Sequence, residues 1–175
     1  MSDTVTVWAL WAVMLFWAVG AYQRLVRMRA HAIAAFAPLD AQFGQYVALV
    51  KDNFSTAAND FAPPAQAGLV GAALQFELSM KVALAHPMDA LAMRALQTAH
   101  ETLRTSWVRV RNEPPDLAGD PLPEALQQQW DHISLNAGEA RTEFNRRVQE
   151  YNAAIQQFPA RLLAWLFGFQ HAHMI

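Results

Sequence analysis

The sequence contains no cysteine, and glycine is scarce, with seven residues in a chain of 175. The lack of cysteine excludes disulfide bonds, thiolate catalysis, cysteine-ligated zinc and iron–sulfur clusters. The patterns HExxH, GxSxG, GxxxxGK[ST] and GxGxxG are also absent, so the sequence carries none of these common catalytic or nucleotide-binding signatures. Positive charge is limited too, since 13 Lys and Arg face 15 Asp and Glu. This balance gives little electrostatic support for nucleic-acid binding.

Apolar residues make up 54% of the chain, and Ala, Leu, Val and Trp supply much of this fraction. The nine prolines cluster at a few places, where they divide the chain into long segments. Long segments of helix-forming residues with short proline-marked connections are typical of helical proteins rather than of sheets. We therefore expect an all-α fold.

An uncharged, apolar run occupies residues 5–22, after a short tail of residues 1–4. At about 1.5 Å per residue the run spans about 27 Å, close to the thickness of a bilayer core. Trp8 and Tyr22 stand near its two ends, where interfacial aromatic residues are expected. The alternative is a cleaved signal peptide, with small residues at Ala18 and Gly20 as the cleavage region. Asp3 is the one charged side chain before the run, whereas a signal peptide has a basic start, so we predict a transmembrane helix.

Three arginines follow the apolar run within the basic segment 23–37, namely Arg24, Arg27 and Arg29. The nearest acidic residue downstream is Asp40. Positively charged flanks remain on the cytoplasmic side of a membrane. We therefore expect a single-pass protein of the inner (plasma) membrane, with its N-terminus outside and the rest of the chain in the cytoplasm.

Residues 38–158 show helical periodicity in four segments separated by prolines, which predicts an antiparallel, up-and-down bundle of about four helices. In the second segment one stripe begins at Leu69, and a further stripe comprises Val70, Leu74, Leu78 and Val82. A helix that is apolar on two faces is expected to be buried between neighbours. Pro87 suits the first turn of the third segment. The expected segments are residues 38–61, 65–85, 88–112 and 124–158, with a proline-rich loop at 113–123 before the last.

An apolar tail, residues 159–175, closes the chain. In an up-and-down bundle of four helices the last helix returns toward the membrane, so this tail should lie near the bilayer surface. Residues 159–169 are too short to span a bilayer. Two interpretations remain open: the tail folds back to cap the bundle core, or it lies in the membrane interface with Trp165 and Phe167 in the apolar phase and Arg161 at the headgroups.

The C-terminal half carries an ordered series of short motifs, and with it the chain resembles the LemA family of bacterial membrane proteins. A second similarity covers residues 22–26, directly after the apolar run, whereas residues 63–122 match the family poorly. The resemblance implies a single-pass anchor with an up-and-down helical bundle, and it implies no established catalysis and no cofactor. The motifs are Glu139-Ala140-Arg141, Phe144-Asn145, Tyr151-Asn152, Phe158-Pro159 and Leu166-Phe167-Gly168-Phe169.

Asn145 and Asn152 lie seven residues apart and therefore share one face of the predicted helix. Each follows an aromatic residue of the apolar stripe. Asparagine beside a helical seam fixes its register through hydrogen bonds, so we expect a structural role for this pair. Contact with a ligand is the alternative.

No constellation of residues predicts a metal, cofactor or catalytic site. His171 and His173 form a His-x-His pair, which is a weak metal signal at the end of a chain. Glu139 and Glu143 lie one turn apart, but a di-iron bundle also needs Glu-x-x-His motifs, which are missing.

We therefore predict a non-enzymatic, membrane-tethered interaction or scaffold module. Its expected partners are the lipid bilayer and an unidentified membrane or cytoplasmic protein, and its Trp- and Ala-rich helices leave room for self-association. The loop at 113–123 and the tail are the expected contact sites. The main alternative is an extracytoplasmic ligand-binding or sensory bundle, which requires the opposite topology. A third and weaker option is an enzyme whose site has no recognisable motif.

Overall fold

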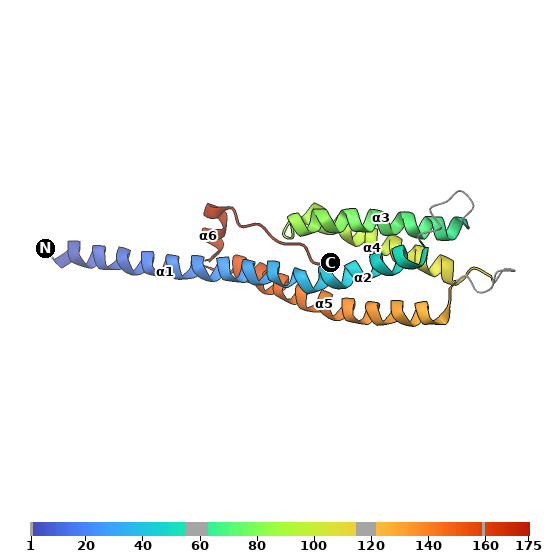
Figure 1. Cartoon of the computed structure of the whole chain (residues 1–175). Coiled ribbons are helices and arrows are strands. Elements are labelled where there is room, and N and C mark those ends of the chain that lie inside the picture. The colour runs from blue at the N-terminus through green and yellow to red at the C-terminus, as the bar shows by residue number, and fades with distance from the viewer. Residues whose placement is uncertain (1, 55–62, 115–121, 159) are drawn as a thin grey trace.

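The computed structural model describes residues 2–54, 63–114, 122–158 and 160–175, with side chains from residue 6 onward. Within these residues the chain forms six helices and no strand, as expected for an all-α protein (Figure 1). Four helices correspond to the expected bundle segments, and a short sixth helix lies in the tail. The helices are α1 (Ser2–Ala34), α2 (Phe36–Phe54), α3 (Pro64–Ala85), α4 (Ala90–Arg111), α5 (Glu124–Gln156) and α6 (Ala160–Phe167).

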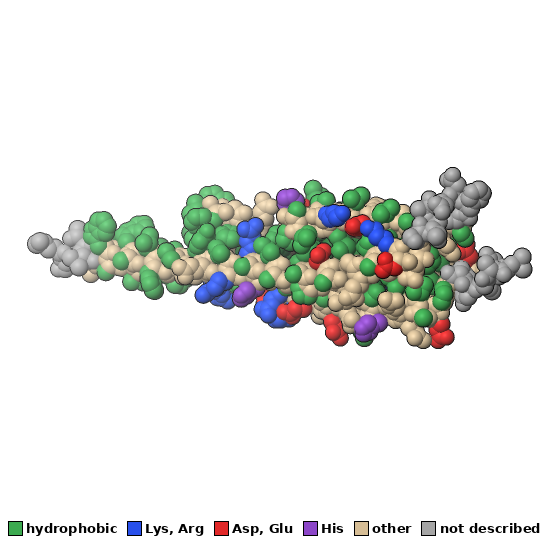
Figure 2. Space-filling model, in the orientation of Figure 1, with side chains coloured by type: hydrophobic (Ala, Val, Ile, Leu, Met, Phe, Trp, Pro, Cys, Tyr) green, Lys and Arg blue, Asp and Glu red, His purple; other side chains and the backbone are tan. Residues whose placement is uncertain are grey.

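The N-terminal half of α1 projects beyond the bundle as a single helix (Figure 1). Its large apolar side chains are exposed from Val7 to Val19, and Figure 2 shows apolar side chains as green atoms along this part of the rod. This helix is long and apolar enough to cross a membrane. The exposed side chains include Trp8, Trp11, Leu15, Phe16 and Trp17.

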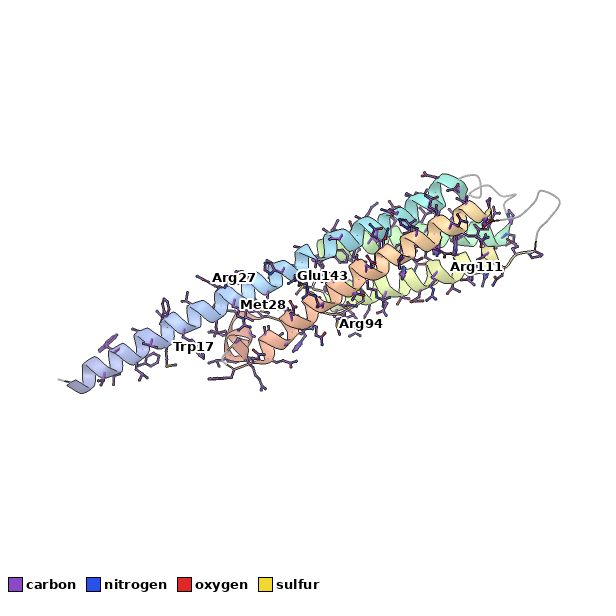
Figure 3. All side chains as sticks on the ribbon, turned by 90° about the horizontal axis from the view of Figure 1, so that it is seen from below. Trp17, Arg27, Met28, Arg94, Arg111 and Glu143 are labelled. Atoms are coloured by element: carbon purple, nitrogen blue, oxygen red, sulfur yellow. The ribbon has the colours of Figure 1, made fainter. Side chains whose placement is uncertain are left out.

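The rest of α1 belongs to the bundle, which corrects the expectation of a separate basic segment at 23–37. Leu25 and Ala32 are buried, and α1 packs against α5 over this length. Figure 3 shows Arg27 and Met28 at the level where α1 begins to run beside α5. Apolar residues interspersed with the arginines account for this packing.

A one-residue turn at Ala35 separates α1 from α2. Pro38 explains its position, because proline has no N–H to donate to the carbonyl four residues earlier, which belongs to Ala34. The expected helix start at Pro38 is therefore two residues late, since α2 begins at Phe36 and Pro38 lies in its first turn. The expected end at Phe61 falls outside the described residues.

Aromatic rings hold the bundle together between its helices. Phe36 of α2 packs on Phe144 of α5 with ring centroids 5.5 Å apart. Phe43 of α2 lies 5.2 Å from Phe76 of α3. Edge and tilted contacts of this kind are favourable beyond the burial of area that they bring. α2 thus packs against both α3 and α5, and α4 packs against α3 on the side remote from α1.

The start of α4 differs from the expected one by a few residues. Asp89 caps the helix, because its side chain accepts hydrogen bonds from the backbone N–H groups of Leu91 (2.6 Å) and Ala92 (3.0 Å). These bonds stabilise the carboxylate and lower its pKa. Pro87 lies in the turn before this cap and not in the first helical turn, so an aspartate cap decided the boundary.

One expectation for α3 is wrong. The stripe that begins at Leu69 is buried, but the second stripe faces solvent, and the exposed fractions of Leu74, Leu78 and Val82 are 47%, 64% and 52%. The reason is that, among the described helices, α3 packs against α2 and α4 alone, so none of them covers its outer face. Apolar side chains visible along the upper edge of the bundle in Figure 2 mark this region.

Candidate functional site

Four residues of the motif series on α5 converge on the last six residues of the chain. Asn152, Tyr151, Asn145 and Arg141 lie successively farther from the C-terminal end of α5, and each donates a hydrogen bond to the backbone of residues 170–175. After α6 the chain runs back toward the middle of the bundle as an extended segment (Figure 1). We call residues 169–175 the C-terminal strap.

Each asparagine pairs with one residue of the strap through two hydrogen bonds. Asn152 donates its side-chain amide to the carbonyl oxygen of Ala172 at 2.9 Å and accepts the N–H of Ala172 at 2.9 Å. Asn145 donates to the carbonyl oxygen of Ile175 at 2.6 Å and accepts its N–H at 2.9 Å. The two amide side chains therefore satisfy the backbone as a neighbouring β-strand would.

The spacing of the two asparagines along α5 matches the spacing of the two strap residues that they bind. Residues seven apart on a helix are separated by about 10.5 Å along its axis. Three residues of extended chain, from Ala172 to Ile175, cover about 10 Å. The interval between Asn145 and Asn152 is thus the one that an extended peptide running antiparallel to α5 requires.

Arg141 and Tyr151 complete the contact at its two ends. The Arg141 guanidinium donates to the carbonyl oxygen of Ile175. The Tyr151 hydroxyl donates to the carbonyl oxygen of Gln170 at 3.0 Å. Burial raises the pKa of this hydroxyl, and the charge of Arg29 opposes the rise, so Tyr151 stays protonated and remains a donor.

The strap buries two apolar side chains, leaves Phe169 and His173 half-buried and exposes the others. Ala172 and Ile175 are buried, whereas His171 and Met174 are exposed. Gly168, with φ of +70°, makes the turn from α6 into the strap, a conformation that favours glycine at a helix end. His171 and His173 gather no third ligand, and no group of metal-ligating side chains occurs among the described residues.

The two asparagines were expected to have a structural role beside the helical seam. The hydrogen bonds given above join them to the chain's own C-terminal strap, so their partner is an extended segment and not a neighbouring helix. Phe158, the aromatic residue of the Phe158-Pro159 motif, is exposed beyond the end of α5, and its ring centroid lies 6.2 Å from that of Trp17. Pro159 falls outside the described residues.

The apolar tail divides into two parts with different environments. The strap packs on the bundle, and α6 contributes Ala164 to the core, with Ala160 and Leu163 partly buried against it and its other apolar side chains exposed. Phe167 and Phe169 lie against Tyr22 of α1, with ring centroids 4.8 Å and 5.9 Å away. Trp165 is 82% exposed, and Arg161 is exposed beside it. α6 thus stands next to the projecting apolar half of α1.

Arg24, Arg27 and Arg29 are exposed on α1 at this same level. In Figure 2, Lys and Arg side chains appear in blue just beyond the apolar projection. The arrangement brings basic residues, α6 and the start of the bundle together around one level of α1.

A cleft between α4 and α5 continues the line of the strap. Its cavity measures about 370 Å³, and the stacked rings of Trp107 and Trp130, 4.1 Å apart, are part of its lining. The cleft was not predicted from the sequence. Helical periodicity shows which face of each helix is apolar, but it does not show which helices leave space between them. Its charged residues are Arg104, Arg111, Asp131 and Arg141.

His100 lies where the strap ends and the cleft begins. Its ring stacks on Phe43 at 5.1 Å, and Ile175 lines the same small pocket. Burial lowers the pKa of the imidazole, the charges of Arg141 and Arg104 act in the same direction, and Glu101 opposes them. The ring is therefore neutral at pH 7 and serves as an aromatic packing element.

A comparison with protein-family models matches residues 77–175 to the LemA family, which is more than half of the chain. The match covers α4, α5, α6 and the strap, and it includes part of the region 63–122 that the motif comparison had matched poorly. Residues 22–26 lie outside it. No curated protein and no solved structure matches the chain.

Proposed function

Because the chain belongs to the LemA family, we propose that it is a membrane-anchored helical bundle that works as a non-enzymatic interaction module at the cytoplasmic face of the inner membrane. The projecting half of α1 is the anchor in this proposal. Arg24, Arg27 and Arg29 favour a cytoplasmic bundle, because basic flanks are retained on that side.

The observation that carries the proposal is the exposed outer face of α3. Leu74, Leu78 and Val82 form an apolar ridge at steps of four residues, and none of the six described helices lies against it. Contiguous exposed apolar side chains in this arrangement are typical of a surface that a partner covers. A ridge at steps of four fits the groove of another helix. We therefore propose an amphipathic helix of a partner protein as the occupant.

The chemistry of the motif residues supports recognition rather than catalysis. Arg141, Asn145, Tyr151 and Asn152 are all engaged with peptide backbone. Amide and guanidinium groups in such bonds position a chain without activating a nucleophile or a water molecule.

One observation favours the alternative of an extracytoplasmic ligand-binding bundle. A cavity of about 910 Å³ lies between α1, the turn before α4 and the start of the strap, and Tyr22, Arg29 and His86 are among its lining residues. A cavity of this size could hold a small molecule. Topology separates the two proposals, because the alternative places the bundle outside the cytoplasm.

A photo-crosslinking amino acid at Leu78 tests the interaction surface. The matched control places the same amino acid at Thr98, an exposed polar position on α4. In intact cells we expect a discrete crosslinked product from Leu78 and none from Thr98. A product with twice the mass of the chain identifies a second copy as the occupant. Equal products from both positions, or none from Leu78, contradict the proposal.

A further inference from the structure

We infer that the Asn145–Asn152 face of α5 is a binding groove for an extended peptide, which the strap occupies in cis and which an acidic-ended peptide segment of a partner protein takes in its place. The inference rests on the proposed function, because it gives the interaction module a second, distinct recognition site. It follows from how the strap is held, from what the strap leaves unfilled and from how it is connected.

The groove recognises backbone rather than side chains. Four hydrogen bonds between the motif residues and the strap use peptide N–H or C=O groups of Gln170, Ala172 and Ile175, and two more reach the main-chain oxygen of Ile175, the last residue of the sequence. The first four are available to any extended peptide except at proline. Side-chain selectivity is confined to two buried positions three residues apart, occupied here by Ala172 and Ile175.

The strap does not fill the groove to its end. Ile175 lies level with Arg141, and the cleft between α4 and α5 continues from there along both helices. From Arg141 to Asp131 the distance along α5 is about 15 Å, which is the reach of four or five extended residues. A peptide that extends past the position of Ile175 would therefore make contacts that the strap lacks.

The unfilled part of the groove is cationic. Arg104, Arg111 and Arg141 line it, against the single carboxylate of Asp131. The ion pair of Arg104 with Glu101 is weak, because the two side chains are exposed and the charged atoms are 3.9 Å apart. In Figure 3 Arg111 lies toward the end of the bundle remote from the projecting half of α1. Acidic residues after the two apolar positions would complement this charge.

The connection of the strap allows it to leave. Two buried side chains, the backbone bonds and the Phe169 ring against Tyr22 hold it, and Gly168 joins it to α6, which has its own contact with α1. A cis peptide benefits from a high effective concentration. A partner must therefore gain additional contacts to displace it, and the cationic cleft offers them.

Peptide binding to the full chain in detergent tests the inference. We would release the strap with Ala172→Lys and Ile175→Lys, because lysine beside Arg141 is repelled from the groove. The fluorescent probes are the strap peptide FQHAHMI followed by GEEEE or by GQQQQ. We expect the acidic peptide to bind the released chain at least tenfold more tightly than the glutamine peptide and more tightly than it binds the unmodified chain.

Two variants of the released chain assign the binding to the groove. Arg104→Gln with Arg111→Gln should remove the advantage of the acidic peptide, whereas Arg94→Gln with Arg109→Gln, the same charge change on α4 outside the cleft, should leave it intact. Asn145→Leu with Asn152→Leu should abolish binding of both peptides. Absence of saturable binding to the released chain with unchanged helix content would overturn the inference. Equal binding of the two peptides would contradict an acidic partner segment. The strap of a second copy of the chain would then be the better occupant.

Amide exchange of the unmodified chain provides a measurement that needs no variant. The N–H groups of Ala172 and Ile175 should exchange faster than those of the core around Phe144, and the acidic peptide should accelerate them further. Exchange of the strap amides only together with the core would show that the groove never opens. The crosslinking at Leu78 does not involve the groove, so failure here leaves the proposed function standing.

Discussion

Asn152 and Asn145 act as substitutes for a neighbouring strand, each presenting one acceptor and one donor to a single residue of the strap. A side-chain amide has the same donor and acceptor groups as a peptide bond. Sequence analysis identified both residues and their common face. It could not identify their partner, because helical spacing says nothing about an extended segment twenty or thirty residues away.

Replacing Asn152 by alanine should loosen the strap rather than the bundle. The change leaves the N–H and C=O groups of Ala172 without partners at a partly buried position, which costs about 1–3 kcal/mol. Faster amide exchange at Ala172, with a smaller change in the overall melting temperature, is the expected result. Asn136→Ala is the control, since Asn136 pairs only with His132 on the exposed surface of α5. Equal effects of the two changes would argue against the strap contact.

His100 gives the bundle a dependence on pH. Because burial lowers its pKa in the folded chain, the unfolded chain binds the proton more readily as the pH falls. The stability contributed by the neutral ring is therefore complete above the ordinary pKa of about 6.5 and is lost as the pH falls toward the lower folded value. Arg141 and Arg104 reinforce this loss, and Glu101 opposes it.

The melting temperature should accordingly fall between pH 7 and pH 5 by more in the unmodified chain than in His100→Leu. His132→Gln, which removes an exposed histidine of α5, should retain the steeper fall. A pH profile of His100→Leu that parallels the unmodified chain would contradict a buried, neutral His100.

At the level of elements, periodicity predicted the helices and proline predicted their breaks. The predicted boundaries differed from those observed where a local interaction or backbone turn determines the helix end, as with the Asp89 cap and the turn at Ala35. The predicted burial of the second apolar stripe of α3 was wrong for a different reason. The stripe of Leu74, Leu78 and Val82 has the pattern of a buried face, and only the number of helices around α3 reveals that it is exposed.

α6 is the element whose environment the sequence described least well. Its apolar residues suggest a buried cap, yet most of them face outward beside the projecting half of α1. We expect them to lie in the membrane interface, where an amphipathic helix of this kind inserts its apolar face. This position agrees with the direction of α5, which returns toward the projecting half of α1.

Substitution of Trp165 and Leu162 by serine tests this expectation. Because both side chains are largely exposed in the chain itself, each change should alter the free energy of unfolding in detergent by about 0.5 kcal/mol or less. An environment-sensitive dye at Leu166→Cys should report an apolar surrounding in lipid nanodiscs. The serine changes should shift the dye toward a polar one. The comparison is Phe144→Ala, which removes a fully buried ring and should cost about 3–5 kcal/mol. A similar loss for the serine changes would place α6 in the core.

At the scale of the whole molecule, α1 joins a projecting apolar rod to a bundle with two surfaces that we propose as partner sites. The outer face of α3 is open, and the groove on α5 is occupied by the strap. Both lie on the bundle, away from the projecting apolar half of α1 (Figure 1). The bundle and any partner must therefore lie on the same side of the membrane.

Topology is the measurement that tests this requirement most directly. The chain has no cysteine, so Thr98→Cys places a single thiol on the exposed face of α4, and Ser2→Cys places one before the apolar run. Intact and lysed spheroplasts are treated with a membrane-impermeant maleimide. We predict that the thiol at position 98 reacts only after lysis and that the thiol at position 2 reacts in intact spheroplasts. Labelling of position 98 in intact spheroplasts would contradict a cytoplasmic interaction module and favour an external ligand-binding bundle.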